Sequence, residues 1–231
     1  MGNILVERKE LENIRKLKRL GFPGKEGTCY LNNNIVYKLY HLYDNKRKVN
    51  FCGDKSSCIT FPKDILIDSK SNLIAGYTMD YVTGTKLHDG FSNLVSIEIL
   101  KQAYIKLREE LSKYSDIYMD DLCLDNIFFN ENLEKFILID TSRWYVLNDS
   151  LPNNVETLDK ALVYSLCRNN LAWLINYHDK SPILFDLYRM YKLGERCPFL
   201  DLINELSYHV ESKFGQKVEK IEDLTPKIFK K

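Results

Sequence analysis

The stretch Tyr118-Met-Asp-Asp-Leu-Cys-Leu-Asp-Asn-Ile-Phe-Phe129, followed by Phe136-Ile-Leu-Ile-Asp-Thr-Ser142, decides how this chain is interpreted. The first part contains an acid, Asp121, and an amide five residues on, Asn126. The second part begins with an apolar run, which predicts a short buried strand, and Asp140 follows that run directly. Carboxylate and amide oxygens beside a strand end are hard ligands that suit Mg²⁺ and the phosphates it accompanies. The two parts together therefore predict a magnesium–phosphate site.

The composition allows a folded protein with a sizeable core. The chain has 231 residues, of which 45% are hydrophobic, and its formal net charge is +1. This is enough for one two-lobed domain or two small domains, and the near-neutral charge gives no nucleic-acid signature. The charge is uneven, because residues 1–50 carry 11 Lys and Arg against 5 Asp and Glu. That excess is compatible with phosphate ligands near the N-terminal part or with a solvated basic helix, and both interpretations stay open.

The cysteine and hydropathy patterns favour a cytoplasmic protein with reduced thiols. Six cysteines and four histidines are scattered without a CxxC pattern, so neither a zinc site nor a disulfide framework is predicted. No apolar run reaches the roughly 18 residues of a membrane-spanning helix, so we expect no membrane span. The N-terminus also lacks the apolar core and cleavage site of a signal peptide.

The first 82 residues predict mostly β structure after an N-terminal helix. The helix is expected over residues 7–20 and ends at Gly21. Two hairpins are expected next, with strands at 28–31, 35–40, 59–68 and 73–82. A short helix is expected between them at 46–51.

The second half of the chain predicts helices. Over residues 96–114 the apolar positions recur three and four apart, which is typical of a helix packed on a core. Further helices are expected at 157–174, 183–193 and 199–214. We therefore predict an α+β fold with a small antiparallel β-rich N-terminal part and a mostly α-helical C-terminal part. The predicted divisions are an N-terminal helical extension over 1–20 and two parts over 21–82 and 83–231.

The opening stretch resembles the catalytic loop and metal-binding Asp of the protein kinase-like superfamily. The resemblance is carried by the pattern Asp-Leu-x-x-x-Asn from Asp121 to Asn126 and by the apolar strand that ends in Asp140. It implies a two-lobed kinase-like fold, similar to that of short bacterial-type kinases and aminoglycoside phosphotransferases.

Three upstream segments resemble the family's other motifs and occur in family order. Gly24-Lys-Glu-Gly27 resembles part of the glycine-rich loop, although it also reads as an ordinary hairpin entry. Val36-Tyr-Lys38 resembles the strand with the ATP-binding lysine, although a solvent-facing lysine on an edge strand has the same pattern. Residues 76–87 resemble the fifth strand and hinge, or simply the end of an amphipathic strand.

The resemblance implies a catalytic site for ATP and Mg²⁺. Asp121 would accept the proton of the attacking hydroxyl, and Asn126 and Asp140 would hold the metal. Lys38 would neutralise the α- and β-phosphates. The acceptor would be a hydroxyl-bearing protein or small molecule that the sequence does not identify.

The resemblance also implies how the nucleotide is held. The backbone at Gly24 and Gly27 would approach the phosphates. Met79 would be the gatekeeper, and the backbone of Asp80, Tyr81 and Val82 would hydrogen-bond the adenine. Further along, residues 157–166 resemble a buried helix whose acid, here Asp159, holds the catalytic loop; a helix-capping role explains the same residue.

Several positions depart from the family pattern. Cys123 stands where the family has a cation, and Thr141-Ser142 replaces Phe-Gly. No Glu lies between Glu26 and Glu98, so Lys38 lacks its usual partner; Asp44, Asp54 or Asp140 would have to take that place. The chain is therefore either an active phosphotransferase or a pseudokinase that binds nucleotide. Transfer of AMP and a non-kinase binding role are further alternatives.

Overall fold

The computed structural model describes residues 2–44, 49–147, 154–177 and 198–229, and the chain divides into two compact units. The first unit comprises residues 1–82, 117–121 and 138–148. The second comprises residues 83–116, 122–137 and 149–231. The first is mostly strands and the second mostly helices, so the predicted α+β class is confirmed.

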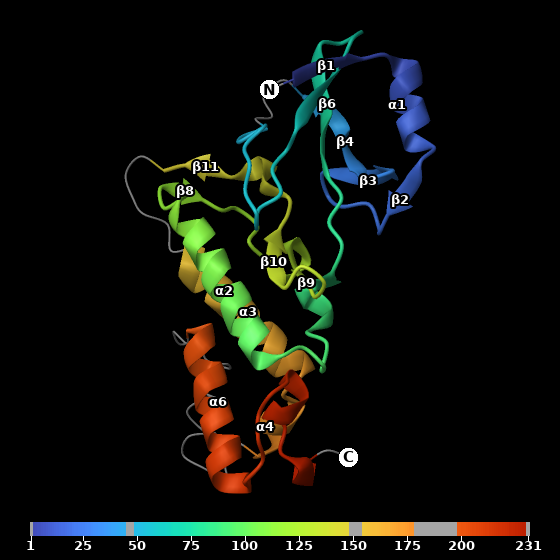
Figure 1. Ribbon diagram of the computed structural model, residues 1–231. Coiled ribbons are helices and arrows are strands. Elements are labelled where there is room, and N and C mark those ends of the chain that lie inside the picture. The colour runs from blue at the N-terminus through green and yellow to red at the C-terminus, as the bar shows by residue number, and fades with distance from the viewer. Residues whose placement is uncertain (1, 45–48, 148–153, 178–197, 230–231) are drawn as a thin grey trace. The chain divides into compact units, whose positions relative to one another are not determined.

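A six-stranded sheet forms the framework of the first unit (Figure 1). Its strands are β1 (Gly2–Val6), β2 (Lys18–Leu20), β3 (Gly27–Asn32), β4 (Ile35–Asp44), β5 (Asp64–Asp68) and β6 (Leu73–Asp80). They lie in the order β1-β5-β6-β4-β3-β2, and all neighbours pair antiparallel except β1, which runs parallel to β5. The sequence had predicted an antiparallel sheet, and the parallel pairing of β1 with β5 departs from that prediction.

Both hairpin turns contain an asparagine with an unusual backbone conformation. Asn33 and Asn72 adopt left-handed backbone angles, with φ of 54° and 55°, in the turns between β3 and β4 and between β5 and β6. Asparagine tolerates this conformation better than most side chains do. The predicted hairpins are thus present, with β4 extending to Asp44.

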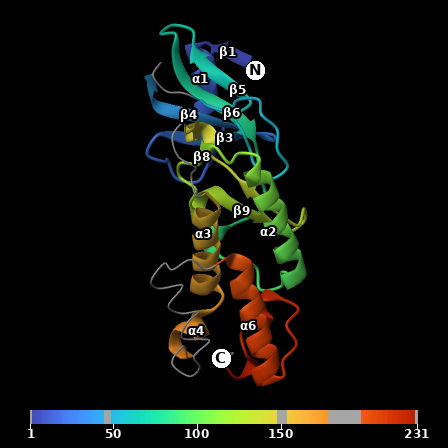
Figure 2. The same cartoon turned by 90° about the vertical axis from the view of Figure 1, so that its left-hand side faces the viewer.

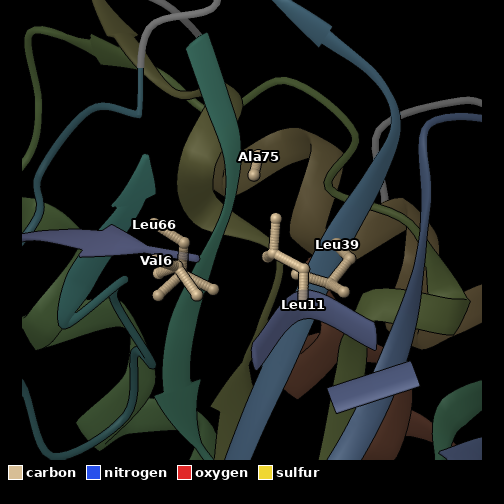
Figure 3. Close-up of a cluster of buried hydrophobic side chains, with 5 residues drawn as sticks. All are labelled: Val6, Leu11, Leu39, Leu66 and Ala75. Atoms are coloured by element: carbon tan, nitrogen blue, oxygen red, sulfur yellow. The ribbon is translucent and has the colours of Figure 1, made fainter. Parts of the chain in front are cut away.

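Helix α1 (Arg8–Arg15) covers one face of this sheet. Leu11 is its buried residue, and it packs in one cluster with side chains from four strands: Val6, Leu39, Leu66 and Ala75 (Figure 3). The opposite face carries a second cluster, which contains Val36, Tyr40, Val49, Tyr77 and Met79. Because side chains alternate along a strand, β4 sends Leu39 toward α1 and Lys38 toward the second cluster.

The N-terminal segment differs from its prediction. The helix expected over 7–20 ends at Arg15, and residues 18–20 form β2, which pairs with β3. Residues 2–6 form β1 instead of part of a helical extension. Pairing with strands distant in sequence has overridden the local helical preference. Of the short helix expected at 46–51, the described part, 49–51, is not helical.

Two short strands complete the first unit. These are β8 (Ile117–Tyr118) and β11 (Tyr145–Val146), which pair antiparallel. They bring the segment before Asp121 beside the segment after Asp140. The rings of Tyr118 and Tyr145 lie in contact, with centroids 5.3 Å apart.

The second unit consists of helices and a small sheet (Figure 2). Its helices are α2 (Ile97–Ser112), α3 (Asn154–Asn169), α4 (Ala172–Tyr177) and α6 (Phe199–Phe214). The sheet contains β7 (Thr85–Lys86), β9 (Ile127–Asn130) and β10 (Lys135–Leu138). Short 3-10 helices lie at Leu87–Asp89, Leu124–Asn126, Ile221–Leu224 and Lys227–Phe229, and a fifth, Thr141–Arg143, belongs to the first unit.

The helices predicted over 96–114 and 199–214 are confirmed as α2 and α6. Both bury one face, and Leu100, Leu107 and Leu206 are among the side chains with no exposed surface. The helix expected over 157–174 is interrupted at Asn170, whose side chain hydrogen-bonds both the N–H and the C=O of Phe91. The helix expected over 183–193 lies outside the described residues.

Asp159 is buried in the second unit and joins three helices. Its carboxylate accepts hydrogen bonds from the Tyr104 hydroxyl on α2 and from the Phe199 N–H at the start of α6. Burial, followed by the bond to Asp159, raises the pKa of Tyr104, so its hydroxyl remains a donor. Asp159 lies within α3 and not at its N-terminus, so it does not cap its own helix as the capping interpretation expected; its carboxylate instead bonds to the first N–H group of α6. Among the described helices, none is both long and apolar enough to cross a membrane.

The buried imidazole of His209 on α6 predicts a loss of stability in mild acid. Burial lowers its pKa, with Lys213 as the second cause, so the folded protein binds a proton less readily than the unfolded chain. The free energy of unfolding should therefore fall as the pH drops below about 6.5, by up to about 1.4 kcal/mol per pH unit. Thermal unfolding at pH 7.5 and pH 5.5 measures this. His209→Asn, which does not titrate, should have the shallower pH dependence; equal slopes for the two proteins would contradict the prediction.

Candidate functional site

Lys38 lies in the middle of the sheet of the first unit. Its strand, β4, is flanked by β3 and β6, and Lys38 itself is only 7% exposed. The alternative of a solvent-facing lysine on an edge strand is therefore wrong. A buried ammonium group needs an anionic partner, because desolvating an unpaired charge is costly.

That partner is Asp140. The Nζ atom of Lys38 lies 2.5 Å from Asp140 Oδ1, which makes Asp140 the partner among the three acids considered from the sequence. The Tyr77 hydroxyl donates a second hydrogen bond to the same Oδ1, at 2.9 Å. Lys38 Nζ also stands 5.6 Å from the centre of the Tyr77 ring, within range of a cation–π interaction. Lysine, carboxylate and phenol thus form one cluster in the first unit.

The Tyr77 phenol is held as a neutral donor. The side chain has no exposed surface, and burial raises its pKa far above the ordinary value, with the negative charge of Asp140 as the next cause. Both donors converge on Oδ1, and Oδ2 of Asp140 has no hydrogen-bond partner among the residues that the structure describes. Since the Asp140 side chain is 27% exposed, it can present this second oxygen to a ligand.

Sequence reasoning did not identify Tyr77. The signal was present but depended on strand register, because Tyr77 on β6 lies directly opposite Lys38 on β4. Opposite residues in a pair of strands project from the same face of the sheet. Knowledge of the register would have placed the phenol beside the lysine.

The predicted base Asp121 and the predicted metal ligand Asp140 both adopt left-handed backbone conformations. The φ angle is 63° at Asp121 and 59° at Asp140. Neither residue lies in a hairpin turn, in contrast to Asn33 and Asn72. Such angles cost non-glycine residues about 1–3 kcal/mol and cluster at functional sites. Asp121 belongs to the first unit together with Lys38 and Asp140, whereas Asn126 belongs to the second, so the meeting of all four remains a prediction.

The turn from Gly24 to Gly27, the glycine turn, has a structural reason for its glycine at position 27. A Cβ atom on Gly27 would lie 2.3 Å from the Leu39 carbonyl oxygen on β4, so this position requires glycine for strand pairing. The Gly24 N–H donates to the Gly27 carbonyl, and His41 Nε2 lies within hydrogen-bond distance of the Gly24 carbonyl. Local hydrogen bonds thus hold the turn, and any role of its glycines toward phosphate remains a prediction.

Gly27→Ala is expected to destabilise the fold. The added methyl group would force β3 away from β4, at a cost of about 1–3 kcal/mol for overpacking of this kind. Gly24→Ala is the matched control, because its Cβ would meet only the Gly27 carbonyl at 3.5 Å. Urea denaturation of the two variants measures the difference. Equal stability of both variants would show that the close contact with Leu39 is relieved without cost.

Part of the predicted hinge, Met79 to Val82, already makes contacts within the first unit. Met79 is buried on β6, and the Asp80 carboxylate, at the end of that strand, pairs with Lys63 at 2.5 Å. The Tyr81 N–H donates to the Asn34 carbonyl, so this group of the predicted adenine contact is already engaged. Val82 has no hydrogen bond to any residue that the structure describes. Its N–H and C=O are therefore the better candidates for a base contact.

The oxygen ligands of Asp140 and Asn126 suit a magnesium ion that binds together with a nucleotide. Within the described ranges, no three His, Cys, Asp or Glu side chains lie together as a metal site. Magnesium commonly takes only one or two protein ligands and completes its shell with phosphate oxygens and water. The open Oδ2 of Asp140 and the amide of Asn126 have this chemistry.

Comparisons with known proteins give structural similarity only. No family model and no curated protein matches the sequence. Among solved structures, the chain is similar to an apo pseudokinase, with a TM-score of 0.49 and 8% sequence identity over 89% of this chain and 96% of that one. The fold assignment rests on the order of the elements themselves. The β-rich unit with a buried lysine, the strand that ends at Asp80, the long helix, the loop at 121–126 and the hairpin before Asp140 follow one another in the order expected of a kinase-like α+β fold.

Proposed function

We propose that this chain is an ATP-dependent phosphotransferase that moves the γ-phosphate to a hydroxyl group of a protein or small molecule. The observation that carries the proposal is the Lys38–Asp140–Tyr77 cluster. A buried lysine and a strained, partly exposed aspartate with one open oxygen are what binding of a metal–nucleotide complex requires.

Each residue has one task in the proposed reaction. Asp121 orients the acceptor hydroxyl and takes its proton as the oxygen attacks the γ-phosphorus. The bond from the γ-phosphorus to the β–γ bridging oxygen breaks, and ADP leaves. Lys38 neutralises the α- and β-phosphates, and Val82 contacts the adenine through its backbone. Asp140 and Asn126 would hold Mg²⁺, which would supply positive charge against the phosphate oxygens.

The ion pair between Lys38 and Asp140 bears on how nucleotide binds. The two groups are paired with each other, so bound phosphates and a metal ion would have to share them. Lysine has three donors, and Asp140 retains Oδ2, so each can keep the other and still accept a ligand. Tyr77 holds Oδ1 in place meanwhile. The pairing is therefore compatible with an active site.

A nucleotide-binding pseudokinase is the alternative. It is favoured by Cys123, which cannot provide the positive charge that the family has at that position, and by the absence of a Glu partner for Lys38. This alternative keeps the same ATP and Mg²⁺ site but predicts no turnover.

The decisive experiment is binding followed by labelling. Mg-ATP should raise the melting temperature of the full chain, and label from the γ-phosphate should be transferred or released. Label transferred from the α-phosphate instead would indicate AMP transfer. Binding without turnover of ATP in the presence of protein and small-molecule hydroxyl acceptors would favour the pseudokinase. A melting temperature unchanged by Mg-ATP, with no nucleotide bound, would overturn both.

A further inference from the structure

Arg143, three residues after Asp140, is a cation that the proposed function gives no role. Arg143 is the last residue of the 3-10 helix Thr141–Arg143. Its Nη2 lies 2.5 Å from Asp120 Oδ2, and its Nη1 lies 3.8 Å from Glu26 Oε1. Asp120 immediately precedes the proposed base Asp121, and Glu26 belongs to the glycine turn. The guanidinium group thus touches both segments.

The backbone around Arg143 is fixed on both sides. The Thr141 hydroxyl donates to the Thr60 carbonyl at 3.2 Å, and the Asn50 N–H donates to the Ser142 carbonyl at 3.3 Å. Trp144 is 2% exposed, and its carbonyl accepts a hydrogen bond of 2.6 Å from the Asn50 side chain. The arginine therefore extends from a backbone that hydrogen bonds hold on both sides, and half of its side chain is exposed.

The guanidinium group has donors to spare. Arginine offers five N–H donors in a planar fork that matches the oxygens of phosphate. Asp120 engages Nη2, while the separation from Glu26 exceeds hydrogen-bond distance and leaves a purely electrostatic attraction. Arg143 has no polar partner other than these two carboxylates among the residues that the structure describes. A phosphate could therefore bind the fork while Asp120 still anchors it.

We propose that Arg143 binds the terminal phosphate of ATP and supplies the positive charge that Cys123 cannot. This inference rests on the proposed function, in which the glycine turn covers the phosphates and Asp121 faces the γ-phosphorus. A side chain that contacts Glu26 of the turn and Asp120 beside the base stands at the terminal-phosphate end of the nucleotide. Lys38, paired with Asp140, remains with the α- and β-phosphates.

Glu26 gains a role from the same geometry. Its carboxylate approaches the guanidinium group where a phosphate oxygen would bind, so the γ-phosphate has to displace it. Exposed ion pairs of this length are weak, and the displacement is correspondingly easy. Removing the Glu26 charge should therefore favour ATP over ADP, in the direction opposite to removing the charge of Arg143.

The test compares ATP with ADP in the presence of Mg²⁺, by isothermal titration calorimetry on the full chain. Arg143→Gln should weaken ATP binding roughly tenfold to hundredfold, the usual effect of losing a charge-assisted hydrogen bond, and leave ADP within about twofold. Arg143→Lys should lie between wild type and Arg143→Gln. Glu26→Gln should strengthen ATP binding by about twofold to fivefold without affecting ADP. Arg19→Gln on exposed β2 is the control for an equal loss of positive charge.

The possible failures are distinguishable. Wild-type protein that binds neither nucleotide overturns the proposed function and this inference with it. Wild-type protein that binds ATP, with an ATP-to-ADP preference unchanged in Arg143→Gln and Glu26→Gln, overturns this inference alone. Melting temperatures of all variants, measured without nucleotide, show that each one is folded. Because the ratio for two nucleotides is measured on one sample, a partly unfolded fraction does not change it.

Discussion

Asp140→Ala is expected to abolish Mg²⁺-dependent nucleotide binding and to destabilise the first unit. The substitution removes the open Oδ2 and leaves two buried donors, Lys38 Nζ and the Tyr77 hydroxyl, without their shared acceptor. Loss of one member of a fully buried ion pair costs about 3–5 kcal/mol. Asp140 is 27% exposed, so water can partly replace it and we expect about 2 kcal/mol from the lost pairing. Alanine at this left-handed position, where φ is 59°, adds roughly 1–2 kcal/mol of backbone strain, which is the same in every variant that carries Asp140→Ala.

A second substitution separates the two effects of losing Asp140. Lys38→Met in the Asp140→Ala background removes the unpaired buried charge and should recover part of the lost stability, while binding remains absent. Urea denaturation gives the free energies of unfolding for the four proteins of this double-mutant cycle, and calorimetry with Mg-ATP gives the affinities. Wild-type affinity for Mg-ATP in Asp140→Ala would exclude the carboxylate from the site. Equal stability of the single and double variants would show that Lys38 finds another partner.

The sequence predicted those helices and turns whose conformation is set by neighbouring residues. The three-and-four spacing of apolar residues predicted α2, and the strand patterns predicted the two hairpins whose turns contain Asn33 and Asn72. Strands β1 and β2 were missed, because each is held by a partner strand rather than by its own preference. The interruption at Asn170 was missed for a similar reason, since its side chain bonds to Phe91, which is 79 residues away.

The residues of the candidate site divide in the same way, into those found from sequence motifs and those found only from contacts between distant segments. The resemblance to kinase-like motifs singled out Lys38 and Asp140, and their pairing was one of three alternatives left open. Tyr77 could not be found without strand register, because its role comes from lying opposite Lys38. Arg143 has no motif in the sequence and is identified only by the carboxylates of Asp120 and Glu26 around it.

Asp121→Asn is expected to keep Mg-ATP binding and to lose turnover. The carboxylate is proposed to take the proton of the acceptor hydroxyl, and an amide cannot do so. General-base catalysis contributes about 10²- to 10⁴-fold, and we expect a rate loss in that range. Binding should change little, because in the proposed site the metal and phosphates are held by Asp140, Asn126 and Lys38.

The choice of asparagine makes this test specific to chemistry. At Asp121 φ is 63°, a left-handed angle that asparagine tolerates and alanine does not, so Asp121→Ala would add backbone strain to the loss of the base. Asp116→Asn, an exposed position in neither proposed role, controls for the change in charge. Calorimetry with Mg-ATP and release of γ-phosphate label measure binding and turnover separately. If Asp121→Asn turns over ATP as fast as wild type, another group is the base; if it no longer binds Mg-ATP, Asp121 belongs to the ligand set rather than to proton transfer.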